Sequence, residues 1–110
     1  MLTLLEYLDQ SGTNPFAAWF DDLDAQAAAK VRAALLRLEA GNLSNVKAVG
    51  SGVLECKIDF GPGYRIYFGR DGDKIVVLLA GGTKMRQQKD IETAGARWID
   101  YKRRTKKHKG

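Results

Sequence analysis

The chain has 110 residues, enough for one domain with a modest core, and carries eighteen lysines and arginines against thirteen acidic residues. It contains no apolar run of the ~20 residues needed to span a bilayer, no start typical of a secretory signal, and one cysteine. We therefore expect no membrane association, no internal disulfide and a reducing, cytoplasmic environment.

The positive charge is concentrated at the C-terminal end. Residues 102–110 hold six basic residues and no acid, so removing these six from the eighteen leaves twelve basic residues against thirteen acids. The body of the chain is therefore nearly neutral. A basic tail of this kind either attracts nucleic-acid phosphates or is a solvated helix end that aids solubility.

The N-terminal part predicts a strand followed by two helices. Residues 2–8 are short, apolar and partly alternating, which is typical of a strand. Asn14 and Pro15 are typical of the cap and first residue of a helix, and Asp24 can cap a second helix that ends near Gly41. Apolar residues recur at helical spacing and are interpreted as core: Phe16, Trp19, Phe20 and Leu23, then Ala28, Val31, Leu35 and Leu38.

After a loop over residues 45–50, two segments alternate strictly between apolar and polar residues. The apolar positions are Leu54, Cys56, Ile58 and Phe60, then Tyr64, Ile66 and Phe68. A hairpin across residues 61–63 places Glu55, Lys57, Arg65 and Tyr67 together on the opposite face. We expect that face to be wet and able to hold an RNA phosphodiester.

Two alternatives accompany this interpretation. Lys57 and Arg65 could merely pair with Glu55 and Asp59 across strands. Cys56 falls on the apolar face, where a free cysteine is more often a small buried hydrophobe than a catalytic thiol.

The remaining chain predicts a central strand and a closing helix. Asp71-Gly72 indicates a turn, residues 74–80 are apolar on both faces, and Gly81-Gly82 is expected to end that strand. A last helix runs from about Met85 to Arg104. Its apolar stripe is Ile91, Ala94, Trp98 and Tyr101. The order predicts a single α+β domain over residues 1–110, with an antiparallel sheet packed against an N-terminal helical hairpin and a C-terminal helix.

Several chemistries have no suitable residues. The only histidine, His108, lies in the tail, and there is no metal-ligand cluster, phosphate loop or Ser/His/Asp triad. We expect no metal and no cofactor. An enzyme built on this chain must use Lys, Arg, Tyr and carboxylates, which suffice for RNA cleavage because the 2′-hydroxyl of RNA is its own nucleophile.

Three segments carry a family resemblance: residues 63–67 (Gly-Tyr-Arg-Ile-Tyr), residues 78–84 (Leu-Leu-Ala-Gly-Gly-Thr-Lys), and residues 87–91 (Gln-Gln-Lys-Asp-Ile). With them the chain resembles the RelE/ParE toxin superfamily, most closely its HigB-like "addiction module killer protein" branch. The resemblance implies a RelE-like fold and a toxin neutralised by a partner antitoxin. RelE-like members are ribosome-dependent endoribonucleases that cut mRNA in the decoding site.

The resemblance also implies roles for particular residues. Arg65 matches the arginine that contacts the scissile phosphate, Lys84 falls where the family places a basic residue, and Lys57 lies near a lysine position of RelE-like toxins. We expect Arg65 and Lys84 to stabilise the transition state and Lys57 to be the base or an orienting group. Glu55 is the alternative base. The expected RNA-binding residues are Glu55, Tyr67, Arg86, Gln87 and Gln88.

One part of the family pattern is missing. The C-terminal catalytic tyrosine or histidine of some RelE-like enzymes has no counterpart, and only Gln87, Gln88 and Asp90 lie near that position. These three residues could equally just begin the last helix, where the helix dipole favours Asp90.

The expected partners are the ribosome, mRNA and an antitoxin, a helix-turn-helix protein that also binds its own promoter and covers the sheet face or the helical hairpin. A second possible function is ParE-like inhibition of DNA gyrase without RNA cleavage. A third is a toxin-derived nucleic-acid-binding module without activity.

Overall fold

The computed structural model describes the backbone of residues 1–109 and the side chains of residues 1–106. The side chains of Lys107, His108 and Lys109, with Gly110, lie outside the described part, so the expectations for that end of the tail are not addressed. The elements follow in the order β1 (Thr3–Glu6), α1 (Pro15–Asp21), α2 (Ala25–Glu39), β2 (Val46–Gly50), β3 (Val53–Ile58), β4 (Tyr64–Asp71), β5 (Ile75–Thr83), the 3₁₀ helix η1 (Lys84–Arg86) and α3 (Gln87–Lys109).

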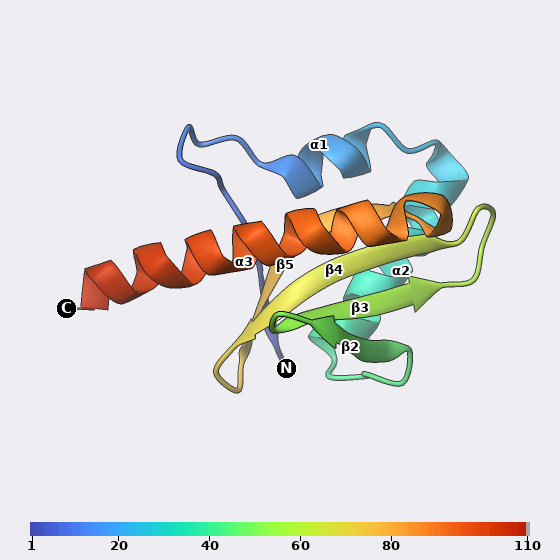
Figure 1. Ribbon diagram of the computed structural model, residues 1–110. Helices are drawn as coiled ribbons and strands as arrows, with labels where there is room; N and C mark the ends of the chain where they lie inside the picture. Colours follow the sequence, from blue (N-terminus) through green and yellow to red (C-terminus); the bar gives the residue numbers. More distant parts are fainter. Residues whose placement is uncertain (110) are drawn as a thin grey trace.

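The strands form one five-stranded sheet in the order β1-β5-β4-β3-β2 (Figure 1). The α+β class is confirmed, with two differences in the sheet. β1 pairs in parallel with β5, so the sheet is mixed rather than wholly antiparallel. The segment expected to be a loop contains β2, an edge strand that is antiparallel to β3. Its residues are mostly exposed, so it lacks the alternation that identifies a half-buried strand.

Both N-terminal helices begin at the predicted caps. The Asn14 side chain accepts a hydrogen bond of 3.0 Å from the backbone N–H of Ala17, and Asp24 accepts one of 2.8 Å from that of Ala27. Each bond satisfies a backbone donor that the helix itself leaves unpaired. Pro15 occupies the first turn of α1, where its missing N–H costs nothing.

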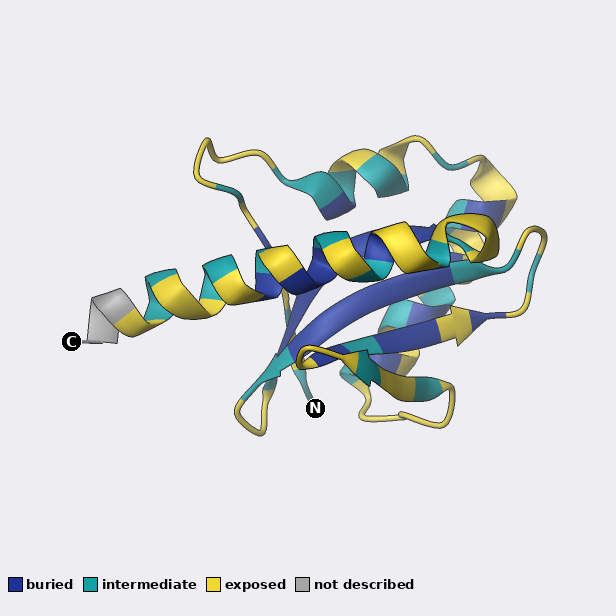
Figure 2. Ribbon diagram, viewed as in Figure 1, coloured by how far each residue is buried: buried dark blue, intermediate teal, exposed yellow. Residues whose placement is uncertain are grey.

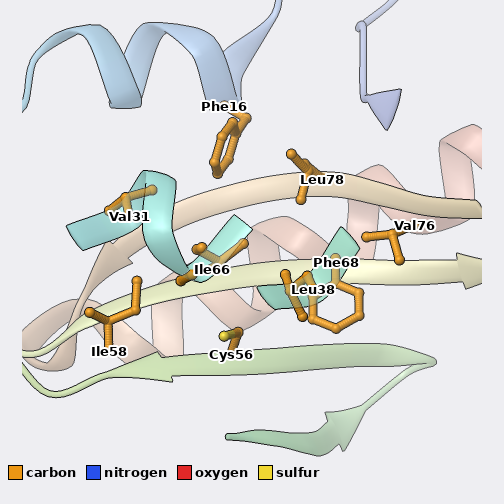
Figure 3. Packing of buried hydrophobic residues seen from close by; sticks show 10 residues of the cluster. Phe16, Val31, Leu38, Cys56, Ile58, Ile66, Phe68, Val76 and Leu78 are labelled. Carbon is orange, nitrogen blue, oxygen red and sulfur yellow. The ribbon is translucent and has the colours of Figure 1, made fainter. Parts of the chain in front are cut away.

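The two N-terminal helices cover one face of the sheet and enclose the first core (Figure 3). The predicted apolar alternation of β3 and β4 is confirmed, because Cys56, Ile58, Ile66 and Phe68 all lie in this core. Phe16 and Val31 contribute from α1 and α2. Burial raises the pKa of the Cys56 thiol, which fits a structural rather than a catalytic cysteine.

Most of the opposite face is buried rather than wet, which corrects the sequence-based expectation. Helix α3 lies across it (Figures 1 and 2), and its predicted stripe packs on a second core. That core contains Tyr7, Val53, Tyr67, Val77, Leu79, Ala80, Ala94 and Trp98. Because β5 is apolar on both faces, exposing Val77 and Leu79 to water would be costly, and α3 removes them from solvent. As a result Glu55 is 1% exposed and Arg65 is 5% exposed.

Gly81 and Gly82 do not end β5, which continues to Thr83. Instead, these two glycines allow side chains of α1 and α3 to approach the backbone of β5 closely. A Cβ atom on Gly81 would lie 2.1 Å from the ring of Trp19, and one on Gly82 would lie 1.9 Å from Oδ2 of Asp90. Glycine is therefore needed at both positions so that α1 and α3 can pack directly on the strand.

The far end of α3 is tied to the sheet and to the N-terminal segment. The Tyr101 hydroxyl donates to Asp71 at 2.8 Å, and the Tyr7 hydroxyl donates to Asp100 at 2.6 Å. Over the described residues, no helix is long and apolar enough to cross a membrane.

Candidate functional site

The candidate site lies where α3 begins, at the end of the sheet that carries the β3–β4 turn. The predicted hairpin is confirmed, and its register sets Glu55 opposite Tyr67 and Lys57 opposite Arg65. The register also sets Arg65 opposite Gly82 on β5, directly before the segment that leads into α3. Side chains far apart in sequence are therefore brought to one end of one sheet face.

Arg65 is buried and held in a defined orientation. Its Nε lies 3.5 Å from Oε1 of Glu55, and its Nη1 donates a 3.0 Å hydrogen bond to the carbonyl oxygen of Gly63. The same carbonyl accepts a 2.9 Å hydrogen bond from the backbone N–H of Lys84. One carbonyl thus joins the side chain of Arg65 to the backbone of Lys84, although the two residues are nineteen positions apart in the printed sequence.

Gly63 is required for this arrangement on two grounds. Its φ is +81°, in the left-handed region that side chains disfavour, and a Cβ atom would lie 3.1 Å from Arg65 Nη1. The glycine in the Gly-Tyr-Arg segment therefore gives the guanidinium access to the turn's backbone.

Glu55 is enclosed and engaged by several partners. Its Oε2 accepts a 2.7 Å hydrogen bond from Nε2 of Gln87 at the start of α3, while Oε1 faces Arg65 and lies 3.9 Å from Nζ of Lys47. A buried carboxylate needs such partners to offset its lost hydration. The arrangement suits a group that holds Arg65 and α3 in place better than an open general base.

Lys57 points to solvent and has an acidic partner of its own. Its Nζ lies 3.4 Å from Asp59, and its side chain is 54% exposed. The alternative in which Lys57 and Arg65 pair with Asp59 and Glu55 is thus the arrangement found, with the Lys57 pair formed along the chain rather than across strands. Lys57 borders the site as an accessible cation, and its catalytic role stays a prediction.

Tyr67 does not face solvent, so its expected role as an RNA-binding residue is not supported. Its side chain is fully buried, and among the described residues its hydroxyl has no hydrogen-bond partner. Burial, followed by the negative charges of Glu55 and Asp90, raises the Tyr67 pKa strongly.

Asp90 lies in the first turn of α3, as the structural alternative for this segment predicts. Its carboxylate is pressed against the Gly82 backbone, and within the described part of the chain Oδ2 lacks a hydrogen-bond partner. Burial raises the pKa of Asp90, and the positive charges of Arg86, Arg97 and Lys89 oppose that shift only in part.

The other predicted residues surround the buried pair. Lys84, Arg86 and Gln88 are exposed, and Gln87 is half-buried against Glu55. The sequence did not indicate Lys47, because it lies on β2, the strand that was expected to be a loop. Its position opposite Glu55 follows from the β2–β3 register, which no local pattern announces.

Two open grooves meet at Lys47. One, of about 570 Å³, lies between β2 and the start of α3 and has Lys47 and Lys84 among its lining residues. The other, of about 330 Å³, is lined by Lys47, Glu55 and Lys57. Among the described residues, no group of three or more His, Cys, Asp or Glu side chains is placed to hold a metal ion.

Comparisons with known proteins agree with the resemblance seen in the sequence. Residues 18–98 match the family model described as "Phage derived protein Gp49-like (DUF891)". The chain is also 41% identical over 83 residues to an uncharacterized protein of Haemophilus influenzae, a match that covers 74% of this chain and 84% of the relative. The matched residues include α2, all four strands from β2 to β5, and the N-terminal half of α3.

Proposed function

Because the chain belongs to the Gp49-like (DUF891) family, a HigB-like toxin family of the RelE/ParE superfamily, we propose that it is the toxin of a toxin–antitoxin pair. Its activity in this proposal is cleavage of messenger RNA on the ribosome, which arrests translation. Ribosomes and message place that activity in the cytoplasm.

The observation that carries the proposal is that the Arg65 guanidinium and the backbone N–H of Lys84 both donate a hydrogen bond to the carbonyl oxygen of Gly63. RNA cleavage begins when a 2′-hydroxyl loses its proton and attacks the adjacent phosphorus, which forms a phosphorane with extra negative charge. The bond to the 5′-oxygen of the next nucleotide then breaks, and that oxygen takes up a proton, which leaves a 2′,3′-cyclic phosphate and a 5′-hydroxyl. The Arg65 guanidinium is held at this carbonyl and the Lys84 backbone is anchored to the same atom, so that one fixed cation and one accessible lysine can stabilise that charge. Each such donor can lower the barrier by ~3 kcal/mol.

The remaining residues take supporting roles in this mechanism. Lys57 orients the 2′-hydroxyl or accepts its proton, and Glu55 holds Arg65 rather than acting as the base. The ribosome supplies the substrate geometry, because orientation alone accounts for a large part of such a barrier. The chain then needs to supply only charge stabilisation and proton transfer, which suits a site where the described residues include only a few accessible cations.

The test is primer extension on a defined mRNA in a purified translation system, with and without ribosomes. Lys84→Gln is the informative variant because its side chain is exposed, so the protein should fold normally. Lys74→Gln is the matched control, since Lys74 is an exposed lysine in the β4–β5 turn at the other end of the sheet. Cuts should require ribosomes, fall roughly 10²-fold or more in Lys84→Gln, and persist in the control.

Arg65→Ala should abolish the cuts as well, provided that circular dichroism shows a folded protein. Cuts that survive in Lys84→Gln and in folded Arg65→Ala would contradict the proposed mechanism. If the wild type makes no cuts and leaves translation intact, a supercoiling assay with DNA gyrase tests the ParE-like alternative.

The partner antitoxin is proposed as a helix-turn-helix protein that binds its own promoter. Co-expression should relieve the growth arrest that the toxin causes alone. Growth arrest that persists when a soluble neighbour-encoded protein is co-expressed would count against that protein as the antitoxin.

A further inference from the structure

We infer that the groove between β2 and the start of α3 binds single-stranded RNA beside the cut phosphate, with Lys47 holding a neighbouring phosphate. The inference rests on the proposed function, because it takes RNA as the substrate. It adds a residue, Lys47, and a path for the strand that neither the family resemblance nor the family match supplies.

The chemistry of the groove favours a polyanion with exposed bases. Lys47 stands on the β2 wall, while Lys84, Met85 and Gln88 stand on the wall formed by η1 and the start of α3. No acidic side chain lines the groove among the residues that the structure describes. Its volume of about 570 Å³ lies within the range of ordinary ligand sites.

The groove leads directly to the proposed reaction centre. Nζ of Lys47 lies 3.9 Å from Oε1 of Glu55, and Nε of Arg65 lies 3.5 Å from that same oxygen. The two cations therefore flank one carboxylate oxygen, as neighbouring positive charges from different strands. A strand whose cut phosphate lies at Arg65 would pass its next phosphate to Lys47.

The path continues on the other side of Lys47, where the smaller groove reaches Lys57. Lys57 is already paired with Asp59, but both side chains are exposed. Exposed ion pairs contribute little free energy, so a phosphate can replace Asp59 at low cost. Lysines 57, 47 and 84 thus border one continuous route along the edge of the sheet.

Met85 and Gln88 provide contacts for the bases. Met85 is 94% exposed, although an apolar side chain at a protein surface gains nothing from water there. Its flexible thioether can pack on the flat face of any base. Gln88 is exposed, whereas the Gln87 amide is committed to Glu55, so Gln88 is the amide available for a base edge.

Single-stranded RNA fits this surface better than a duplex. In an A-form duplex the base faces are stacked and the deep, narrow major groove excludes side chains, whereas unpaired bases can reach apolar and amide groups. A protein segment is the competing occupant of an open groove of this kind, and the experiment below separates the two.

The experiment measures binding to ribosomes programmed with an mRNA that carries 2′-deoxy sugars across the A-site codon, so that the RNA cannot be cut. Lys47→Gln, Met85→Ala and Gln88→Ala are compared with Lys74→Gln and Leu36→Ala. Leu36 is an exposed residue on α2, which packs against the opposite face of the sheet. Thermal unfolding of each variant verifies that it is folded.

Lys47→Gln should weaken binding several-fold and lower the slope of log affinity against log salt by about 0.7, the value for one phosphate contact on a single strand. Met85→Ala should weaken binding about two- to tenfold with an unchanged salt slope. Gln88→Ala should alter which codons are preferred, and both controls should match the wild type.

The outcomes separate this inference from the proposed function. If the wild type binds the uncleavable RNA through the groove but cuts no normal RNA, RNA binding in the groove is supported and the nuclease proposal is refuted. If the wild type cuts RNA and the groove variants bind and cut RNA as the wild type does, the inference about the groove is refuted while the nuclease proposal is supported. Variants that keep RNA binding but lose antitoxin binding would show that the groove is a protein site, which also overturns the inference.

Discussion

The burial of Glu55 with Arg65 leads to a quantitative prediction about stability that does not depend on the function. Both side chains are almost completely enclosed, at 1% and 6% exposure, and they face each other at 3.5 Å. Removing one partner of such a pair typically costs 3–5 kcal/mol, because the other charge is left buried without compensation. Arg65 keeps its hydrogen bond to Gly63, so we expect a loss of about 3 kcal/mol for Glu55→Gln, at the lower end of that range.

The assay is a double-mutant cycle measured by urea unfolding. Glu55→Gln and Arg65→Met are made singly and together, and the cycle isolates the energy that the pair shares. The double variant no longer contains an unpaired buried charge, so it should cost much less than the sum of the two single changes. We expect a coupling energy of about 2–3 kcal/mol.

The matched control is the pair Lys57 and Asp59, which lie at a similar distance of 3.4 Å but are 54% and 84% exposed. Its coupling energy, from Lys57→Gln and Asp59→Asn, should be about 0.5 kcal/mol or less. If the buried pair shows a coupling energy as small as that of the control, burial does not determine the strength of these contacts and the reasoning is refuted.

Three further predictions concern close approach and burial. Gly63→Ala should lower the free energy of unfolding by about 1–2 kcal/mol because of its positive φ, which urea unfolding measures. It should also impair RNA cleavage, measured by primer extension, because the added Cβ atom would lie 3.1 Å from Nη1 of Arg65 and push the guanidinium aside. Gly81→Ala should destabilise the fold by about 1–3 kcal/mol or more, since its methyl group overlaps the Trp19 ring; an unchanged unfolding midpoint would contradict this. Cys56 should react with a thiol reagent far more slowly in the folded than in the unfolded protein, because it is buried and its thiol pKa is raised; equal rates would contradict this.

Local features of the fold could be predicted from the sequence because their causes are local. Asn14 and Asp24 cap their helices through side chains three residues from the donors they satisfy. The β3–β4 hairpin follows from strict alternation and a glycine-rich turn, and it brings Lys57 and Arg65 to one face as expected. Such features depend on neighbouring residues alone.

The missed features depend on contacts between distant residues. β1 pairs with β5 across about seventy positions of chain, so its parallel direction has no local signature. β2 is a mostly exposed edge strand, and its mixed burial gives no period to detect. Because the sequence predicts a loop where β2 lies, it also gives no indication that Lys47 belongs to the site.

The sequence contains a signal for the burial of the polar face. Val77 and Leu79 make β5 apolar on the face that Arg65 occupies, and α3 has an apolar stripe that needs a partner. Together they require α3 to cover that face, with the polar residues retained only where the helix starts. The site is therefore a boundary, formed at the start of the covering helix, where the sheet meets solvent.

Asp90, at the start of α3, should make the stability of the fold depend on pH. Burial raises its pKa above the ordinary 3.8, so the folded protein binds a proton at this group more tightly than the unfolded chain does. The folded state is consequently favoured when Asp90 is protonated, and its contribution to stability falls as the pH rises from 3.8 through the raised pKa. Near neutral pH the ionised carboxylate, pressed against Gly82 with an unpartnered oxygen, opposes the docking of α3.

Asp90→Asn removes that charge while keeping the shape of the side chain. The variant should be more stable than the wild type at pH 7, and the difference should shrink as the pH is lowered through the raised pKa toward 3.8. Because every other titrating group is common to both proteins, the difference between their urea unfolding curves isolates Asp90. The opposing attraction of Arg86 and Arg97 is already included in the direction of the shift. A variant that is less stable than the wild type at pH 7, by an amount that shrinks as the pH is lowered, would show that those attractions, and not desolvation, dominate where α3 meets the sheet.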